Sequence, residues 1–213
     1  MNWLSRLLSN RTDPSNLDEG LRKALADWQS LPRPDLSRPH FETRYVVLNT
    51  EAGGFEVERD PLLAVAGIAI RGNTVIGAES YHARLDPDPA TALMNLLTFC
   101  GKGPVVVYNS ALNRAMLEHA FGRHLGLEAD LDWIDLYWVL PGLFDHSGGR
   151  PTNLANWMKS FDIETFQRQH ALGDAYAIAQ LLLAAIAYAG QRGLSSAHSL
   201  SDLEQARRQL IRP

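Results

Sequence analysis

The stretch Tyr45-Val46-Val47-Leu48-Asn49-Thr50-Glu51 decides the fold of this chain. Its first four residues favour β-structure and predict a buried strand, and polar residues follow directly. Alternate side chains on a strand share a face, so Asn49 and Glu51 are predicted to lie on the same side of a sheet. A polar residue after a buried strand usually marks only the edge of the core, so this stretch needs support from the rest of the chain.

The sequence that follows predicts further strands and helices. Apolar runs predict strands over 62–70, 75–83 and 105–108, and Gly72-Asn73 between the first two is typical of a hairpin turn. Helical periodicity covers 90–99, 110–125, 152–161 and 170–188, whereas 132–140 fits either a strand or a helix. Three strands in antiparallel succession, followed by alternating helices and strand, predict an α/β fold with a mixed sheet flanked by helices.

Residues 1–43 are predicted to form an N-terminal helical extension. Ser15-Asn16-Leu17-Asp18 resembles a capping box, and the residues after it have an apolar helical face that ends near Gln29. Residues 1–44 hold seven bases and six acids, so the extension is not a basic tail. It is interpreted as a helix packed on the main domain, and an arm that docks a protein partner is the alternative. The main domain is predicted over 44–190, and residues 191–213 are predicted to form a tail with a surface helix.

Composition limits the class of protein. The 213 residues are 46% hydrophobic, which suffices for one full domain and excludes disorder as the main state. With 24 acids and 20 bases the net charge is −4, whereas proteins that coat duplex DNA are normally basic. The longest apolar run, Leu181 to Ala189, is too short to cross a bilayer, and Met1 to Asn10 lacks the features of a signal peptide. The single cysteine, Cys100, excludes an internal disulfide, so a cytoplasmic protein with no membrane partner is expected.

Two further segments carry polar residues where the chain changes structure. In Tyr108-Asn109-Ser110-Ala111-Leu112-Asn113 a predicted strand ends and a helix begins. In His170-Ala171-Leu172-Gly173-Asp174 the spacing of four residues places His170 and Asp174 on one helical face. Each segment alone is weak, since a His/Asp pair at this spacing is more often a surface or capping arrangement than a catalytic one.

Taken together, the order and spacing of these segments resemble the DEDDh branch of the DnaQ-like 3′–5′ exonucleases. The family's first motif, Asp-x-Glu-Thr-x-Gly, corresponds to Asn49-Thr50-Glu51-Ala52-Gly53-Gly54. Its second, roughly His-Asn-x-x-Phe-Asp, corresponds to residues 108–113, and a His-x-x-x-Asp-Ala form of its third corresponds to residues 170–175. The resemblance covers about residues 44 to 188. It implies a ribonuclease H-like fold with a five-stranded sheet, two divalent metal ions held by four carboxylates, and a histidine that deprotonates the attacking water.

The sequence departs from the family at the metal positions. Asparagines stand at 49 and 113, so only Glu51 and Asp174 remain of the four acids, with His170 as the candidate base. The resemblance thus gives Glu51, Asp174, Asn49 and Asn113 as metal-site positions, and it places Thr50, Ala52 and Asn109 beside the nucleic acid. An amide oxygen carries no net charge, so a cage with half its negative charge should not hold two Mg²⁺ ions. One weakly bound Mg²⁺ or Mn²⁺, or none, is expected.

Asp135 is the acid that the resemblance places near the domain core. An acid in such a segment more often caps a helix or accepts hydrogen bonds from the backbone than it replaces a lost metal ligand.

Three hypotheses about function follow. The first is an inactive or severely weakened exonuclease-fold protein that retains binding of a single-stranded nucleic-acid 3′ end. The second is an active metal-dependent 3′–5′ exonuclease that uses Glu51, Asp174 and His170. The third is a protein-interaction module that docks its partner through the N-terminal extension.

Overall fold

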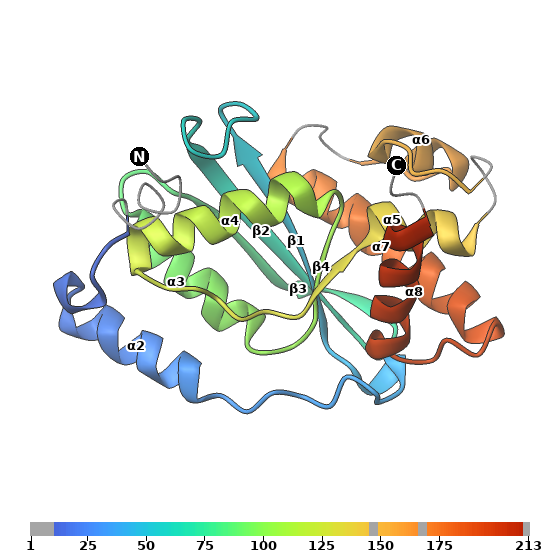
Figure 1. The fold of residues 1–213 in the computed structure, drawn as a ribbon, viewed down its shortest axis with the longest axis horizontal. Helices are drawn as coiled ribbons and strands as arrows, with labels where there is room; N and C mark the ends of the chain where they lie inside the picture. The colour runs from blue at the N-terminus through green and yellow to red at the C-terminus, as the bar shows by residue number, and fades with distance from the viewer. Residues whose placement is uncertain (1–10, 145–148, 166–169, 211–213) are drawn as a thin grey trace.

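The computed structural model describes residues 11–144, 149–165 and 170–210. A five-stranded sheet in the order β3-β2-β1-β4-β5 forms its centre, with helices on both faces (Figure 1). The strands are β1 (Tyr45–Ala52), β2 (Leu62–Arg71), β3 (Thr74–Arg84), β4 (Val105–Val107) and β5 (Trp133–Asp135). The helices are η1 (Pro14–Asn16), α2 (Glu19–Ser30), η2 (His40–Glu42), α3 (Pro89–Cys100), α4 (Ser110–Leu125), α5 (Leu136–Leu143), α6 (Leu154–Ser160), α7 (Ala171–Gln191) and α8 (Ala197–Leu210).

The predicted α/β fold with a mixed five-stranded sheet is confirmed. Strand β1 pairs antiparallel with β2 and parallel with β4, and β4 pairs parallel with β5. Residues 1–10 of the predicted extension and 211–213 of the predicted tail lie outside the described residues.

The hairpin of β2 and β3 turns at Gly72-Asn73, as predicted. Both residues have positive φ angles, 59° and 55°, which match the two-residue turns that join antiparallel strands. The pairing is regular near the turn and then shifts between Ile68 and Ala69, so that His82 lies opposite Ala66. Regular pairing outward from the turn would instead set Glu79 there, and the shift therefore decides which β3 side chains share a face with β1.

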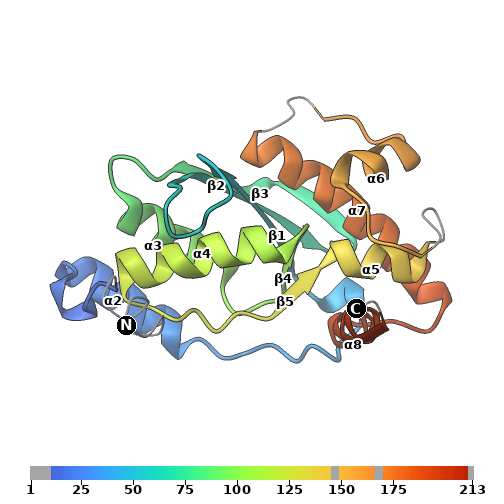
Figure 2. The same cartoon turned by 45° about the horizontal axis from the view of Figure 1, so that its top comes forward.

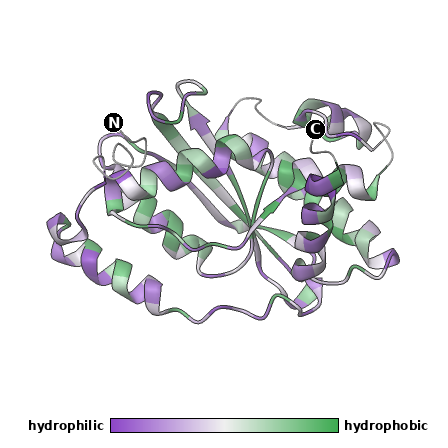
Figure 3. Ribbon diagram, in the orientation of Figure 1, coloured by the Kyte–Doolittle hydropathy of each residue, from purple (hydrophilic) through white to green (hydrophobic). Residues whose placement is uncertain are grey.

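Alternation along β1 sends its side chains into two separate cores. Tyr45 and Val47 belong to the core under α5, α7 and α8, whereas Val46 and Leu48 belong to the core under α3 and α4. Figure 2 shows the two layers of helices on opposite faces of the sheet, and Figure 3 shows that the strands between them are mostly hydrophobic. The same alternation puts Asn49 and Glu51 on the α7 face and Thr50 on the α4 face.

The N-terminal extension lies across the base of the main domain. Leu25 and Trp28 of α2 are buried in the core that α3 and α4 cover, and the Trp28 ring N–H donates to the Gly101 carbonyl at 2.9 Å. The chain then runs to the far end of the molecule, where Pro39 and Ser196 form an isolated bridge (Figure 1). The helix of the extension is packed on the main domain, as expected.

Three details differ from the sequence prediction. The cap of α2 is Asp18, whose carboxylate accepts from the Leu21 N–H at 2.8 Å, because residues 14–16 form the separate turn η1. Residues 132–140 hold both predicted alternatives in succession, β5 and then α5, since Asp135 ends the strand and caps the helix. The surface helix of the tail is α8, but its Ala197 and Leu200 are buried in the core of the main domain.

One helix requires a correction to the expectation about membranes. Within the described residues, α7 is long and apolar enough to cross a bilayer, although its longest uninterrupted apolar run is short. Ile178, Leu181 and Leu182 of this helix are fully buried against the sheet. This packing is that of a core helix in a globular domain.

Gly67 on β2 gives a test of the packing between the sheet and α3. A Cβ atom at this position would lie 2.8 Å from Phe99 Cε1 and 3.1 Å from Leu48 Cδ2. We expect Gly67→Ala to lower the free energy of unfolding by about 1–3 kcal/mol, measured by urea denaturation, because the buried ring must move.

Gly77→Ala is the matched control, since nothing lies within 4 Å of a Cβ atom at that β3 position. Equal effects of the two substitutions would contradict the close packing at Gly67.

Candidate functional site

The three sequence segments meet at the ends of β1 and β4 and at the start of α7. The Asn49 amide on β1 donates to the carbonyl of Ala171, the first residue of α7, at 3.4 Å. On the opposite face, the Asn113 side chain in α4 accepts from the Thr50 N–H at 3.1 Å and from the Thr50 hydroxyl at 2.6 Å. These bonds join β1 to the start of α7 on one face of the sheet and to α4 on the other face.

The Asn113 side chain links β1 to the residue that follows β4, which we call its connector role. It is 8% exposed, and its amide N–H₂ donates to the Tyr108 carbonyl at 2.8 Å, while its oxygen accepts both hydrogen bonds from Thr50. A side chain here must therefore donate on one side and accept on the other, which an amide does and an ionised carboxylate does not. The asparagine at 113 fits the hydrogen bonds of the fold.

His170 and Asp174 lie at the start of α7. His170 precedes the first helical residue, and its carbonyl accepts from the Asp174 N–H at 3.0 Å. Asp174 and Glu51 are both half-buried. The two carboxylates that the sequence resemblance singles out therefore lie at the start of α7 and the end of β1.

His82 on β3 is a site residue that the sequence analysis missed. Its ring stacks on that of His170, with centroids 5.0 Å apart and 28° between the planes. Partial burial and the neighbouring His170 lower the pKa of His82, Glu51 opposes this, and Arg84 adds to it. The sequence shows a histidine near the outer end of a predicted strand. Its place opposite Ala66 could not be predicted, because it depends on the shift in the β2–β3 register.

The three residues predicted to lie beside nucleic acid differ in their contacts and in their exposure to solvent. Thr50 is engaged with Asn113, and Ala52 ends β1 at an irregularity in its pairing with β2. Asn109 is exposed and has a left-handed backbone, with φ 63°. Of these three, Asn109 is the exposed side chain at the start of α4.

Tyr108 stands where the family has histidine, and here it is structural. It is 6% exposed, its hydroxyl donates to the Thr152 carbonyl, and its ring meets Tyr137 edge-on. Burial raises the pKa of this hydroxyl above its ordinary value, so it stays protonated and donates.

The carboxylate of Asp135 accepts hydrogen bonds from the backbone, as expected from the sequence. Its carboxylate accepts from the N–H groups of Asn109, Ser110 and Tyr137 at 2.8–3.0 Å. It is 2% exposed, so it fixes the turn between β4 and α4 and has no face open toward a metal ion.

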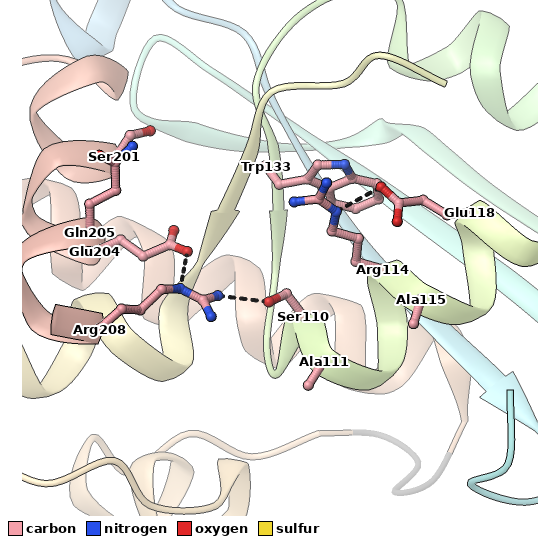
Figure 4. A pocket seen from close by; sticks show the side chains of 10 residues that line it. All are labelled: Ser110, Ala111, Arg114, Ala115, Glu118, Trp133, Ser201, Glu204, Gln205 and Arg208. Atoms are coloured by element: carbon pink, nitrogen blue, oxygen red, sulfur yellow. Dashed lines mark hydrogen bonds and ion pairs between the residues drawn. The ribbon is translucent and has the colours of Figure 1, made fainter. Parts of the chain in front are cut away.

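Helix α8 is tied to this turn through a second carboxylate. Glu204 accepts from the Asp135 N–H at 2.7 Å, and burial raises its pKa although the backbone bond and Arg208 oppose the shift. Figure 4 shows Arg208 between Glu204 and Ser110, with which it bonds at 2.9 and 2.8 Å. These residues line a hollow of about 400 Å³ between α4 and α8, in which Arg114 is also paired, with Glu118. Because its arginines are neutralised, the hollow does not favour an anion.

The donors at the four metal-site positions do not fit a pair of magnesium ions. Asn113 has both ends of its amide engaged, and Asn49 contributes no charge. Within the described residues, no three His, Cys, Asp or Glu side chains are grouped so that they could hold a metal ion. Two dications a few ångströms apart need comparable negative charge around them, and Glu51 and Asp174 supply half of it.

Comparison with known proteins identifies the fold. No protein-family model and no curated protein sequence matches the chain. Among solved structures, cell-death related nuclease 4 (CRN-4) matches with a TM-score of 0.57 and 12% identity, over 69% of this chain and 64% of that one. Exonuclease I of E. coli in complex with a dT13 oligonucleotide matches with a TM-score of 0.51 and 16% identity, over 70% of this chain and 42% of that one.

The fold is ribonuclease H-like, as in these nucleases. A further structure of Exonuclease I gives a TM-score of 0.50 at 16% identity. This chain spans about two fifths of the length of the Exonuclease I chains that it matches. At such identities the likeness establishes the fold alone.

Asn113→Asp tests whether the amide is a structural donor. At neutral pH a carboxylate oxygen would face the Tyr108 carbonyl, so we expect the free energy of unfolding to fall by about 1–3 kcal/mol. The fold then raises the pKa of the new carboxyl, and the loss shrinks as the pH falls through that pKa, because a protonated acid donates again. Urea denaturation at about pH 7 and about pH 4 measures both effects.

Asn95→Asp, on the exposed face of α3, is the control and should change stability by less than about 0.5 kcal/mol. A fully stable Asn113→Asp variant at neutral pH would contradict the connector role.

Arg208→Ala tests the buried carboxylates of the α8 contact. Loss of the guanidinium leaves Asp135 and Glu204 without their cation, so we expect a loss of about 2–3 kcal/mol at neutral pH. Because the folded-state pKa of Glu204 is raised, the cost grows as the pH rises through that pKa and shrinks below it, where Glu204 is neutral. Thermal unfolding over this range, with exposed Arg22→Ala as the control, measures it; a pH-independent loss would argue against the carboxylates as its cause.

Proposed function

We propose that this protein binds the 3′ end of a single-stranded nucleic acid and does not cleave it efficiently. One observation carries the proposal: the amides at 49 and 113 donate to the backbone carbonyls of Ala171 and Tyr108, at the positions where DEDDh exonucleases have carboxylates. The nucleic-acid ligand is supported by the fold, since one structure with this fold is Exonuclease I in complex with an oligonucleotide.

Phe55 is an exposed aromatic residue near the site that could contact a base of the bound strand. It is 84% exposed, and it follows Gly53-Gly54 directly beyond the end of β1. Its loop is closed by the Gly53 N–H on the Pro61 carbonyl at 2.9 Å and the Glu56 N–H on Asp60 at 2.8 Å. An aromatic ring held in water on a closed loop can stack on a base, which favours single strands whose bases are free.

The chemistry left at the site supports binding over cleavage. Glu51 and Asp174 are the two carboxylates at the four metal positions, and so few carboxylates hold at most one Mg²⁺ or Mn²⁺ ion with a phosphate. Two-ion catalysis needs the negative charge that the amides do not supply.

The alternative functions depend on other observations. An active exonuclease would use His170 as base with Glu51 and Asp174, and its activity would vanish in Asp174→Ala. A protein-docking extension would need residues other than Leu25 and Trp28, because the main domain already buries these side chains. The binding function is therefore the one that the described contacts favour.

The test is a binding and trimming experiment with a 5′-fluorescein-labelled single-stranded oligothymidylate. We expect binding by fluorescence anisotropy, and no shortening on a gel with Mg²⁺ or Mn²⁺. Phe55→Ala should weaken binding roughly tenfold, since one stacked base contributes about 1–3 kcal/mol.

Phe41→Ala is the matched control, because Phe41 is 59% exposed and lies in η2, before the other end of β1. Efficient metal-dependent trimming by the wild type would overturn the proposal in favour of an active exonuclease. Absence of binding to single strands would overturn it altogether.

A further inference from the structure

The site has a basic flank that the candidate metal positions do not include. Two rows of opposed residues cross β1, β2 and β3, namely Asn49–Ala66–His82 and Glu51–Ala64–Arg84. Opposed residues in a sheet project from the same face. The face that carries the amide and the acid of β1 therefore carries an imidazole and a guanidinium on β3.

The start of α7 lies between the β1 residues Asn49 and Glu51 and the β3 residues His82 and Arg84. Ala64 and Ala66 in the middle strand are 1% and 0% exposed, and they share a core with Ala171 and Ala175 of α7. His82 and Arg84 are exposed beside this helix, and His170 at its start stacks on His82. The result is an exposed guanidinium and an exposed imidazole on the β3 side of α7, with the half-buried His170 ring packed against the imidazole.

Arg84 is available to a ligand. It takes part in none of the ion pairs formed within the described residues, whereas Arg44, Arg71 and Arg114 are paired with glutamates. Glu51, the acid in its row, lies two strands away, about 9–10 Å, which is close to the Debye length at physiological salt. Glu51 acts on His82, whose pKa it raises against the larger effect of burial, so the phosphate is placed at the Arg84 end of the pair.

We propose that Arg84 and His82 bind a phosphate of the nucleic-acid strand directly, without a metal ion. A guanidinium offers paired N–H donors that match two phosphate oxygens, and the His82 imidazole adds a donor beside it. This inference rests on the proposed function and deepens it, because it names the group that is recognised and the residues that recognise it. If the inference holds, the affinity for the strand does not depend on divalent ions. The affinity falls as the salt concentration rises, because the contact is between a cation and a phosphate.

Binding of the 5′-labelled oligothymidylate in EDTA and in Mg²⁺ tests the proposal. We expect wild-type affinity to differ by less than about twofold between the two buffers. Arg84→Gln should weaken binding about tenfold in EDTA, and the slope of log K against log salt should become shallower by about one. His82→Ala should weaken it about fivefold.

Two variants separate phosphate binding from structure. His82→Phe keeps a ring beside His170 and removes the nitrogens, so it should bind as weakly as His82→Ala. Arg71→Gln removes an arginine at the turn end of the same hairpin and should bind like the wild type. Thermal unfolding of each variant shows that the fold is intact.

The outcomes distinguish this inference from the function on which it rests. Binding only in Mg²⁺ would leave the proposed function standing and overturn the metal-independent site. Binding in EDTA with Arg84→Gln equal to wild type would likewise overturn this site alone. Absence of binding in both buffers would overturn both proposals.

Discussion

The close packing of α7 on β2 is the contact on which the arrangement of the site depends. Ala64 and Ala66 of the strand are buried together with Ala171 and Ala175 of the helix. Small side chains on both elements let the two backbones approach, because there is no bulk between them. The approach brings the Ala171 carbonyl within reach of Asn49, and it brings His170 onto His82.

The two asparagines determine the chemistry of the site in two ways. They carry no negative charge, and they supply N–H donors that the surrounding backbone uses. The second effect matters for any substitution by an acid, since a carboxylate at 113 would have to give up the bond to Tyr108 or stay protonated. At position 113, both the missing charge and the hydrogen bond to Tyr108 therefore disfavour a metal ligand.

A separate set of contacts fixes the turn at the start of α4. Asp135 accepts three backbone N–H groups around this turn, and Glu204 and Arg208 of α8 hold Asp135 from the other side. Two buried acids share one cation, so the α8 contact is sensitive to the loss of that cation. The C-terminal helix is in this way part of the support for Asn109 and Ser110.

The sequence by itself determined the class of fold and the hairpin at Gly72-Asn73, because these follow from local periodicity and from turn residues. The segments of the candidate site came from the resemblance of three motifs to those of the DEDDh exonucleases. It also determined the shortage of acids, since that depends on residue identity alone. Only the tertiary structure decided which carbonyls the asparagine amides bond to, that His82 stacks on His170, and that Arg84 lies in the same row as Glu51. Hydrogen-bond partners far apart in the chain cannot be inferred from spacing, and the irregularity at Ile68 shifts the β3 register away from the one that the turn implies.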